Sequence, residues 1–264
     1  MSGNPVVKFY ILAVGISWLG WIPVVMSSHG IGPFDRPYFQ ILLLFPALGP
    51  MLAAMWVMAR AHGKAGVGEL FNPLFQWRLA PGWLLVASLA PLMLFLLARG
   101  LTGWLGLPVI GSSPRGELLS VAVSAFLVSS LSNPWEEVGW RGFALPRLQE
   151  RYAAWMASLI LGVFWGLWHL PLFFWKGNPM ADYPFFPWFA GIVALSFLYT
   201  WLYNSTQGSL LVTSLFHIFL NTFAAVISGV SVLALAMVYI VAALLLVALF
   251  GGTHLSWRER VRAR

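Results

Sequence analysis

Apolar residues fill eight long segments of the chain, which are separated by polar or glycine- and proline-containing stretches. We place these segments at residues 6–27, 38–60, 83–106, 118–142, 153–175, 185–204, 209–228 and 230–250. A helix needs roughly 20 apolar residues to cross the hydrocarbon core of a bilayer. The pattern therefore predicts an all-α, polytopic transmembrane helical bundle of about eight spans. Because only Gly229 separates the last two segments, a tight hairpin and one long re-entrant stretch both fit the pattern.

Composition supports the membrane class. Of the 264 residues, 60% are hydrophobic and 9% are charged, whereas soluble domains have about 45–50% and about 25%. These values exclude a soluble globular enzyme, a disordered tail and a fibrous repeat. The absence of cysteine excludes a disulfide scaffold, a zinc–thiolate site and a thiol nucleophile. Since no internal repeat is visible, we expect residues 1–264 to form a single transmembrane domain.

Positive charge is distributed unevenly between the two sets of loops, within a net charge of +7. With the N-terminus in the cytoplasm, the inner side collects Lys8, Arg60, Lys64, Arg78, Arg141, Arg147, Arg151, Arg258, Arg260, Arg262 and Arg264. The outer side then collects Arg36, Arg99, Arg115 and Lys176. Cytoplasmic loops carry the excess of Lys and Arg, so this bias predicts cytoplasmic N- and C-termini. The basic tail at 257–264 could also bind anionic lipid, but we interpret it as a solvated topology signal, and the charge does not predict nucleic-acid binding.

Ionisable groups inside the apolar segments are the candidates for chemistry, because charge in hydrocarbon costs a few kcal/mol. These groups, with one carboxamide, are Glu136, Glu137, Arg141, His169, His217 and Asn221. The other histidines, His29, His62 and His254, fall in loops or in the tail, and we interpret them as solvated.

The fourth segment carries the carboxylates. Glu137 and Arg141 are four residues apart and share a helical face, which favours a bidentate ion pair. Glu136 points about 100° away from Glu137, so one carboxylate is expected to be structural and the other free for acid–base work. The alternative is an ion cluster at the cytoplasmic boundary. Pro134 predicts a kink, and Glu136 reaches mid-membrane depth only if the segment tilts or extends past Gly142.

The fifth segment carries one imidazole. Trp165 lies four residues before His169, so an aromatic ring can brace it. Pro171 loosens the helix beside the histidine. The alternative is a single buried histidine that bonds to a neighbouring backbone carbonyl.

The seventh segment offers two hydrogen-bond donors. His217 and Asn221 share a helical face, and convergent donors in a dry site suit a developing oxyanion. The alternative is interhelical polar packing. A metal site is a further alternative, since His169, His217 and a glutamate would form a two-histidine, one-carboxylate set. The zinc-protease pattern H-E-x-x-H is absent.

In order and spacing, these motifs resemble those of a known family. Glu136-Glu137-x-x-x-Arg141, Trp165-x-x-x-His169 and His217-x-x-x-Asn221 resemble the three motifs of the CPBP intramembrane proteases, the CAAX prenyl protease type II and bacteriocin-processing (ABI) family. The motif-bearing core runs over residues 118–228. One departure is Trp165, where the family motif usually has Phe; because the position stays aromatic, we expect little effect.

The resemblance implies a glutamate-dependent intramembrane endopeptidase with an all-helical core of eight spans in a bacterial or archaeal cell membrane. By resemblance, Glu136 would be the general base that activates water, and His169 would assist it. His217 and Asn221 would form the oxyanion hole, while Glu137 and Arg141 would hold the site together. The family mechanism needs no catalytic metal and no cofactor.

The resemblance also implies a peptide or protein substrate, which is a prenylated C-terminal tail for some relatives. Nothing in the sequence marks a prenyl-binding groove or an oligomeric state. Two alternatives to an enzyme remain. One is a non-catalytic membrane scaffold or immunity protein, and the other is a proton- or metal-coupled carrier that uses the Glu and His side chains as a relay.

Overall fold

The computed structural model describes residues 4–34, 36–109 and 116–263, and all regular elements in these ranges are helical. Arg115 and Arg264, which the charge pattern assigns to a loop and the tail, lie outside the described residues. The predicted segments correspond to α1 (Pro5–Ser28), α2 (Leu44–Phe71), α3 (Pro81–Leu105), α4 (Leu118–Glu137), α6 (Ala154–Trp168), α7 (Phe185–Ser205), α8 (Leu210–Val226) and α9 (Val232–Phe250). A π-helical turn, Val138–Ala144, joins α4 to the short α5 (Leu145–Arg151). Short 3-10 helices lie at Pro37–Leu43, Asn72–Phe75, Leu170–Phe174 and Pro179–Asp182.

Six helical stretches within the described residues are long and apolar enough to cross a membrane. They are α1, α3, Leu118–Arg151, Ala154–Phe174, α7 and α9. Helix α8 is apolar but has only 17 residues, and α2 is not among the six. The protein is therefore a multi-pass integral membrane protein. Asn4 and Ala263 line one cavity beside α5, so both ends of the described chain lie at the same end of the bundle. The side of the membrane that they face stays a prediction.

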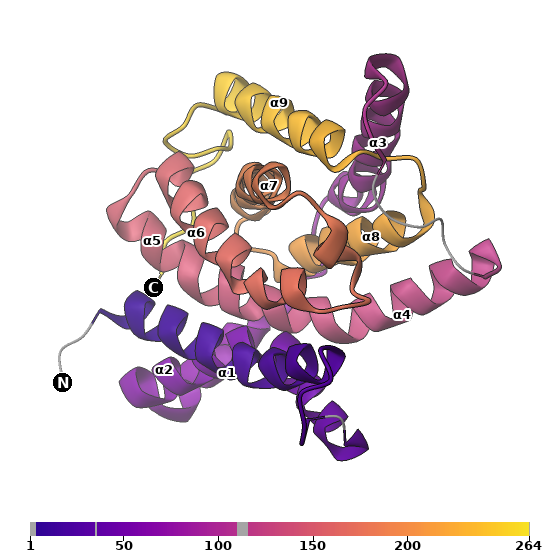
Figure 1. Cartoon of the computed structure of the whole chain (residues 1–264). Helices are drawn as coiled ribbons and strands as arrows, with labels where there is room; N and C mark the ends of the chain where they lie inside the picture. The colour runs from indigo at the N-terminus through magenta and orange to yellow at the C-terminus, as the bar shows by residue number, and fades with distance from the viewer. Residues whose placement is uncertain (1–3, 35, 110–115, 264) are drawn as a thin grey trace.

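Helix α7 occupies the centre of the bundle and packs against α6, α8 and α9 (Figure 1). Helix α4 runs along α8, and the pair α1–α2 lies on the other side of α4 (Figure 1). Two glycines allow this close packing. A Cβ on Gly162 would lie 2.9 Å from the Val193 Cα in α7, and one on Gly139 would lie 2.5 Å from the Pro50 Cβ in α2. At these two points α6 approaches α7, and the fourth segment approaches α2, almost backbone to backbone.

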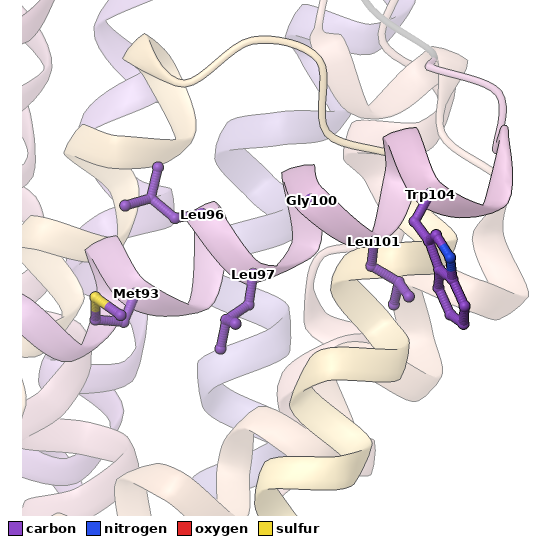
Figure 2. A pocket seen from close by; sticks show the side chains of 6 residues that line it. All are labelled: Met93, Leu96, Leu97, Gly100, Leu101 and Trp104. Carbon is purple, nitrogen blue, oxygen red and sulfur yellow. The ribbon is translucent and has the colours of Figure 1, made fainter.

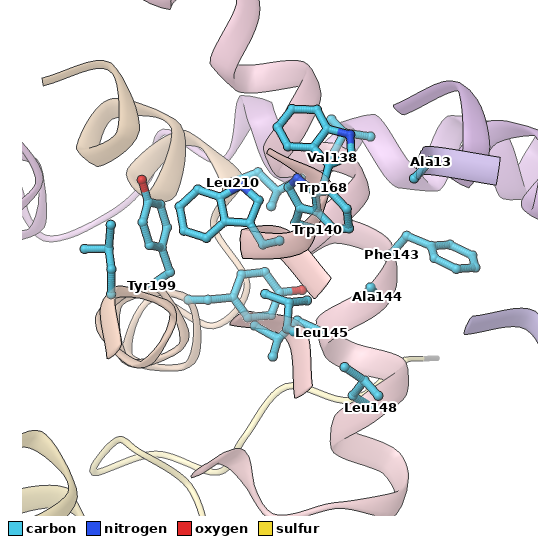
Figure 3. Close-up of a cluster of buried hydrophobic side chains, with 14 of the residues drawn as sticks. Ala13, Val138, Trp140, Phe143, Ala144, Leu145, Leu148, Trp168, Tyr199 and Leu210 are labelled. Carbon is cyan, nitrogen blue, oxygen red and sulfur yellow. The ribbon is translucent and has the colours of Figure 1, made fainter. Parts of the chain in front are cut away.

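Large aromatic side chains fill the core around the π-helical turn (Figure 3). The Trp140 ring meets Phe9 of α1 edge-on at 5.3 Å and Trp168 of α6 at 5.7 Å. Large apolar side chains on α3, α4 and α9, such as Leu85, Leu131 and Leu244, point outward and are exposed. This arrangement suits a bundle whose solvent is lipid, because outward apolar surface needs no polar cover there.

Two boundaries differ from the sequence prediction. Helix α2 continues to Phe71, although the apolar pattern ends at residue 60, and Gly63 interrupts it with φ 63° and ψ −156°. The hydropathy pattern does not predict the end of α2 at Phe71, because a helix can continue beyond the hydrocarbon core as long as its backbone hydrogen bonds continue. At the other boundary, α8 and α9 form neither a tight hairpin nor one re-entrant stretch. The chain turns at residues 227–231, and α9 packs against α7 and α3.

The interpretation of the tail and of His254 as solvated is wrong for the part of the tail nearest the bundle. Gln149 of α5 and Asn204 of α7 are fully buried, and each hydrogen-bonds to the other and to the tail. Gln149 Nε2 donates to the Val261 carbonyl at 2.7 Å, and Asn204 Nδ2 donates to the His254 carbonyl at 2.7 Å. Arg260 Nε donates to the Gln149 carbonyl at 2.9 Å. The tail is therefore tied to two helices by hydrogen bonds.

Candidate active site

One face of α4 is polar and buried. It consists of Ser129, Asn133, Glu136 and Glu137, which are spaced as one stripe of an α-helix. This stripe packs against α8, the helix that carries His217. Glu137 is completely buried and Glu136 is 8% exposed. The carboxylates therefore lie inside the bundle.

Glu137 is the centre of a buried ionic contact. Its Oε1 accepts hydrogen bonds from Arg141 Nη1 at 2.9 Å and from His217 Nδ1 at 3.0 Å. The expected pairing of Glu137 with Arg141 is present, but through one nitrogen and not as a bidentate pair. The guanidinium also lies over Tyr199 at 3.9 Å and over Trp165 at 4.4 Å, so aromatic faces stabilise the rest of its charge. Arg141 is fully buried, so its charge lies within the bundle.

The π-helical turn explains the depth of the carboxylates. The sequence predicts a kink at Pro134, but the irregular stretch lies just after it, at Val138–Ala144. The helix then continues to Arg151, so the apolar stretch Leu118–Arg151 has 34 residues and Glu136 lies near its middle. The fourth segment thus extends past Gly142, which is one of the two conditions that the sequence sets for Glu136 to reach mid-membrane depth. Turns of this kind inside α-helices are frequent at functional sites.

His169 is the first residue after α6 and lies among tryptophan rings. Its Nδ1 is 2.8 Å from the Trp165 carbonyl oxygen, so we assign the proton to Nδ1, which leaves Nε2 as an acceptor. Rings of Trp168 and Trp188 lie 4.6 Å and 5.4 Å from the imidazole. The backbone bond is the one that the alternative interpretation expected, and it leaves the second nitrogen for acid–base work. Trp188 of α7 is buried beside His169.

Trp165 lies between the two imidazoles. Its ring centroid is 5.8 Å from that of His169 and 5.7 Å from that of His217. The Glu136 side chain lies close enough to His217, Glu137 and Arg141 for electrostatic interaction. Three helices therefore bring both carboxylates, the arginine and both imidazoles into one cluster. Within the described chain, no direct hydrogen bond joins Glu136 to His169.

Asn221 lies at the edge of this cluster. It is one helical turn beyond His217, its side chain is exposed, and its Nδ2 donates to Asn133 Oδ1 at 3.4 Å. This contact between α8 and α4 is the polar packing that the alternative interpretation expected. Sequence reasoning missed Asn133, although its spacing to Glu136 and Glu137 places it on the same buried face.

Several buried polar atoms of the cluster have no hydrogen-bond partner among the described residues. They are Asn133 Nδ2, Glu136 Oε2, Glu137 Oε2, Arg141 Nε and Nη2, and Trp165 Nε1. Buried polar groups are usually paired, so this cluster has unused capacity for water or for a polar ligand. No group of three or more His, Cys, Asp or Glu side chains within residues 4–34, 36–109 and 116–263 is arranged to hold a metal ion.

Comparison with known proteins finds relatives of the region that carries these motifs. The family described as type II CAAX prenyl endopeptidase Rce1-like matches residues 115–223. The protein named CAAX prenyl protease 2 from Methanococcus maripaludis is 34% identical over 99 residues. The motif-bearing core is therefore similar to this CAAX protease family.

The family match is confined to part of the molecule. The alignment with the Methanococcus maripaludis protein spans 34% of this chain and 36% of that protein, which is about a third of each. The Rce1-like match includes all six motif residues, from Glu136 to Asn221, and it includes α4, α6 and α7 completely. It leaves out α1, α2, α3 and α9.

Proposed function

We propose that this chain is an intramembrane endopeptidase of the glutamate-dependent type, in which Glu136 and His169 activate the attacking water. The observation that supports this most is the 3.0 Å contact between Glu137 of α4 and His217 of α8, with Trp165 of α6 against both imidazoles. It joins the three motifs in one buried cluster. The proposal uses this chain's own side chains for every step.

Glu136 is the general base in this proposal. Its Oε2 is buried without a partner, so it is available to accept a proton from a water molecule. His169 Nε2, the acceptor left by the backbone bond at Nδ1, orients the same water. The water oxygen then attacks the scissile carbonyl carbon, and the proton on the base passes to the leaving amine. General base catalysis of this kind contributes about 10²- to 10⁴-fold.

His217 and Asn221 are the oxyanion donors. Because His217 Nδ1 donates to Glu137, only the imidazolium form can also donate from Nε2. Asn221 must exchange its long 3.4 Å bond to Asn133 for the oxyanion. Arg141 holds the Glu137 carboxylate in place through its 2.9 Å hydrogen bond, so these two residues position His217.

The substrate class rests on the name of the relative, CAAX prenyl protease 2. We therefore propose peptide or protein substrates that include prenylated C-terminal tails. Comparing the cleavage of a prenylated peptide with that of an unprenylated peptide of the same sequence measures how much the prenyl group contributes to cleavage.

The test is cleavage of prenylated and unprenylated peptides by the full chain in liposomes, with Glu136→Gln as the diagnostic variant. We expect cleavage to fall by about 10² to 10⁴ while the variant inserts and folds. Glu117→Gln is the matched control, since Glu117 is an exposed carboxylate at the start of the same helix. Retained cleavage in Glu136→Gln would remove the proposed base. Ion flux in liposomes without cleavage would favour the carrier, and function without cleavage would favour the scaffold.

A further inference from the structure

The cavity that Asn4 and Ala263 line lies between α1, α5 and α6, at the end of the bundle where both ends of the described chain lie. None of its lining residues belongs to the glutamate cluster. Its volume is about 390 Å³, within the range of small-ligand pockets. Its lining includes apolar residues of α1 and α6 on one side and the charged end of α5 on the other. We propose that this α1/α6 crevice binds one anionic phospholipid, with an acyl chain against the apolar wall and the phosphate at Arg147 and Arg151.

The apolar wall consists of two stripes. Val7 and Ile11 are one helical turn apart on α1, and Ile160 and Phe164 are one turn apart on α6. Ile11 is 67% exposed and Val7 is 52% exposed, so this side of the crevice is open to the lipid. Phe164 stacks on Tyr10 at 4.0 Å. The two apolar stripes, joined at one point by the stacked Tyr10 and Phe164 rings, suit an acyl chain.

The opposite side carries two arginines, neither of which forms a salt bridge within the described chain. Arg147 is partly buried and donates to the Phe143 carbonyl at 3.0 Å and to the Met58 sulfur at 2.9 Å. A guanidinium carries five N–H donors, and these contacts use two of them. Both salt bridges found among the described residues involve Glu137, so neither Arg147 nor Arg151 is paired to a carboxylate within 4 Å there. Arg151 lies exposed in the last turn of α5.

The charge balance at this rim favours an anion. His62 and Glu150 also line the crevice, and Glu150 is the one carboxylate side chain among the lining residues. The lining itself has two arginines against one glutamate, while Glu69, outside the lining, also interacts electrostatically with Arg147. Basic pockets between transmembrane helices bind anionic lipid headgroups. The apolar wall makes a lipid, and not free phosphate, the ligand that fills the whole cavity.

A cavity on the outer side of α3 shows why charge matters here (Figure 2). It holds about 440 Å³ and is lined by Met93, Leu96, Leu97, Gly100, Leu101 and Trp104. No lining residue is charged, so this surface cannot distinguish one lipid headgroup from another. The α1/α6 crevice combines a similar volume with two arginines.

The experiment measures lipid binding to the purified full chain by native mass spectrometry and by thermal shift. The probes are phosphatidylglycerol, phosphatidylcholine with the same acyl chains, and inorganic phosphate. We expect phosphatidylglycerol to bind about tenfold more tightly than phosphatidylcholine, and phosphate alone to give no shift. Arg151→Gln should weaken phosphatidylglycerol about fivefold, because a basic residue near an anionic membrane surface contributes about that factor. Its control, Arg60→Gln, removes an exposed arginine that lies over Trp56 and outside the crevice.

A second pair of variants tests the apolar wall without a change of charge. Ile11→Trp should fill the crevice and weaken both lipids. Leu19→Trp adds the same ring two turns along the same face of α1, at a residue that is 69% exposed, and should change neither. Equal affinity for the two lipids would overturn the proposal. So would a shift with phosphate alone, an equal loss in Arg60→Gln, or an equal loss in Leu19→Trp.

Discussion

Two buried polar clusters in this molecule use their hydrogen bonds differently. In the amide cluster of Gln149, Asn204 and the tail, all four side-chain N–H groups are used. Gln149 Nε2 donates to Asn204 Oδ1 and the Val261 carbonyl, and Asn204 Nδ2 donates to Gln149 Oε1 and the His254 carbonyl. Asn204 Oδ1 accepts a further bond from the Val261 amide at 3.2 Å. The cluster is saturated.

The glutamate cluster is not saturated. Glu136, Glu137 and Arg141 each have at least one buried polar atom that finds no partner among the described residues. A polar network with every member paired rigidifies a core, while an incomplete one is costly. The difference indicates that the amide cluster holds the structure together. The glutamate cluster keeps bonding capacity that a water molecule and a substrate can use.

The largest effect on stability is expected for Arg141→Leu. Removing one member of a buried ion pair destabilises a protein by about 3–5 kcal/mol, because the remaining charge is left uncompensated. Glu137 would then lose its cation, and His217 would lose its fixed partner. Chemical unfolding in detergent measures the loss, and Arg78→Leu, at an exposed arginine, is the control. A change below about 1 kcal/mol would show that the pair is not structural.

Asn221→Ala separates catalysis from packing. If Asn221 donates to the oxyanion, its removal should lower the cleavage rate by about 10²- to 10³-fold. The unfolding free energy should change by less than about 1 kcal/mol, since the side chain is exposed and its bond is long. Asn133→Ala breaks the same contact from the other side. The opposite result, lost stability with an unchanged rate, would support interhelical packing as the role of Asn221.

Gln149→Leu is expected to destabilise the protein by about 1–3 kcal/mol, because it leaves Asn204 buried without its partner. The double variant Gln149→Leu, Asn204→Leu should cost less than the sum of the two single changes. Chemical unfolding of all three variants gives the coupling energy. Cleavage should stay within about tenfold of wild type at permissive temperature, so a selective loss of activity would contradict a purely structural role.

The smallest effect is expected for Trp165→Phe. The indole N–H approaches the Glu136 carboxylate but has no partner in hydrogen-bond geometry, and a phenyl ring keeps the contacts to both imidazoles. We expect the cleavage rate to change less than about tenfold. Trp165→Ala, which also removes the ring, should cost about 3–5 kcal/mol of stability. A large rate loss in Trp165→Phe would assign a role to the N–H.

The sequence predicts the helices well, because a bilayer allows few structures other than long apolar helices. It also predicts the contact between Glu137 and Arg141, which depends only on four-residue spacing. It does not predict what Gln149, Asn204 and Trp188 contact, since those partners lie far along the chain. The position of Asn133 on the buried face of α4 could be predicted from its spacing to Glu136, but a neutral amide beside serines is a weaker signal of function than a charged group. The single-nitrogen form of the Arg141 contact depends on Tyr199 and Trp165, which no local pattern places there.

The π-helical turn at Val138–Ala144 sets a limit on chain length. Such a turn accommodates one more residue than an α-helical turn, and the residues after it keep the phase that the helix would have without that residue. If one further residue were inserted and the stretch did not absorb it, the seven residues of α5 would rotate by about 100° about the helix axis. Gln149 would then leave Asn204, and Arg147 would leave Met58. A one-residue insertion in this stretch should therefore be far more damaging than a one-residue deletion, for instance of Gly142, which lets the stretch rewind as ordinary helix with α5 in the same phase.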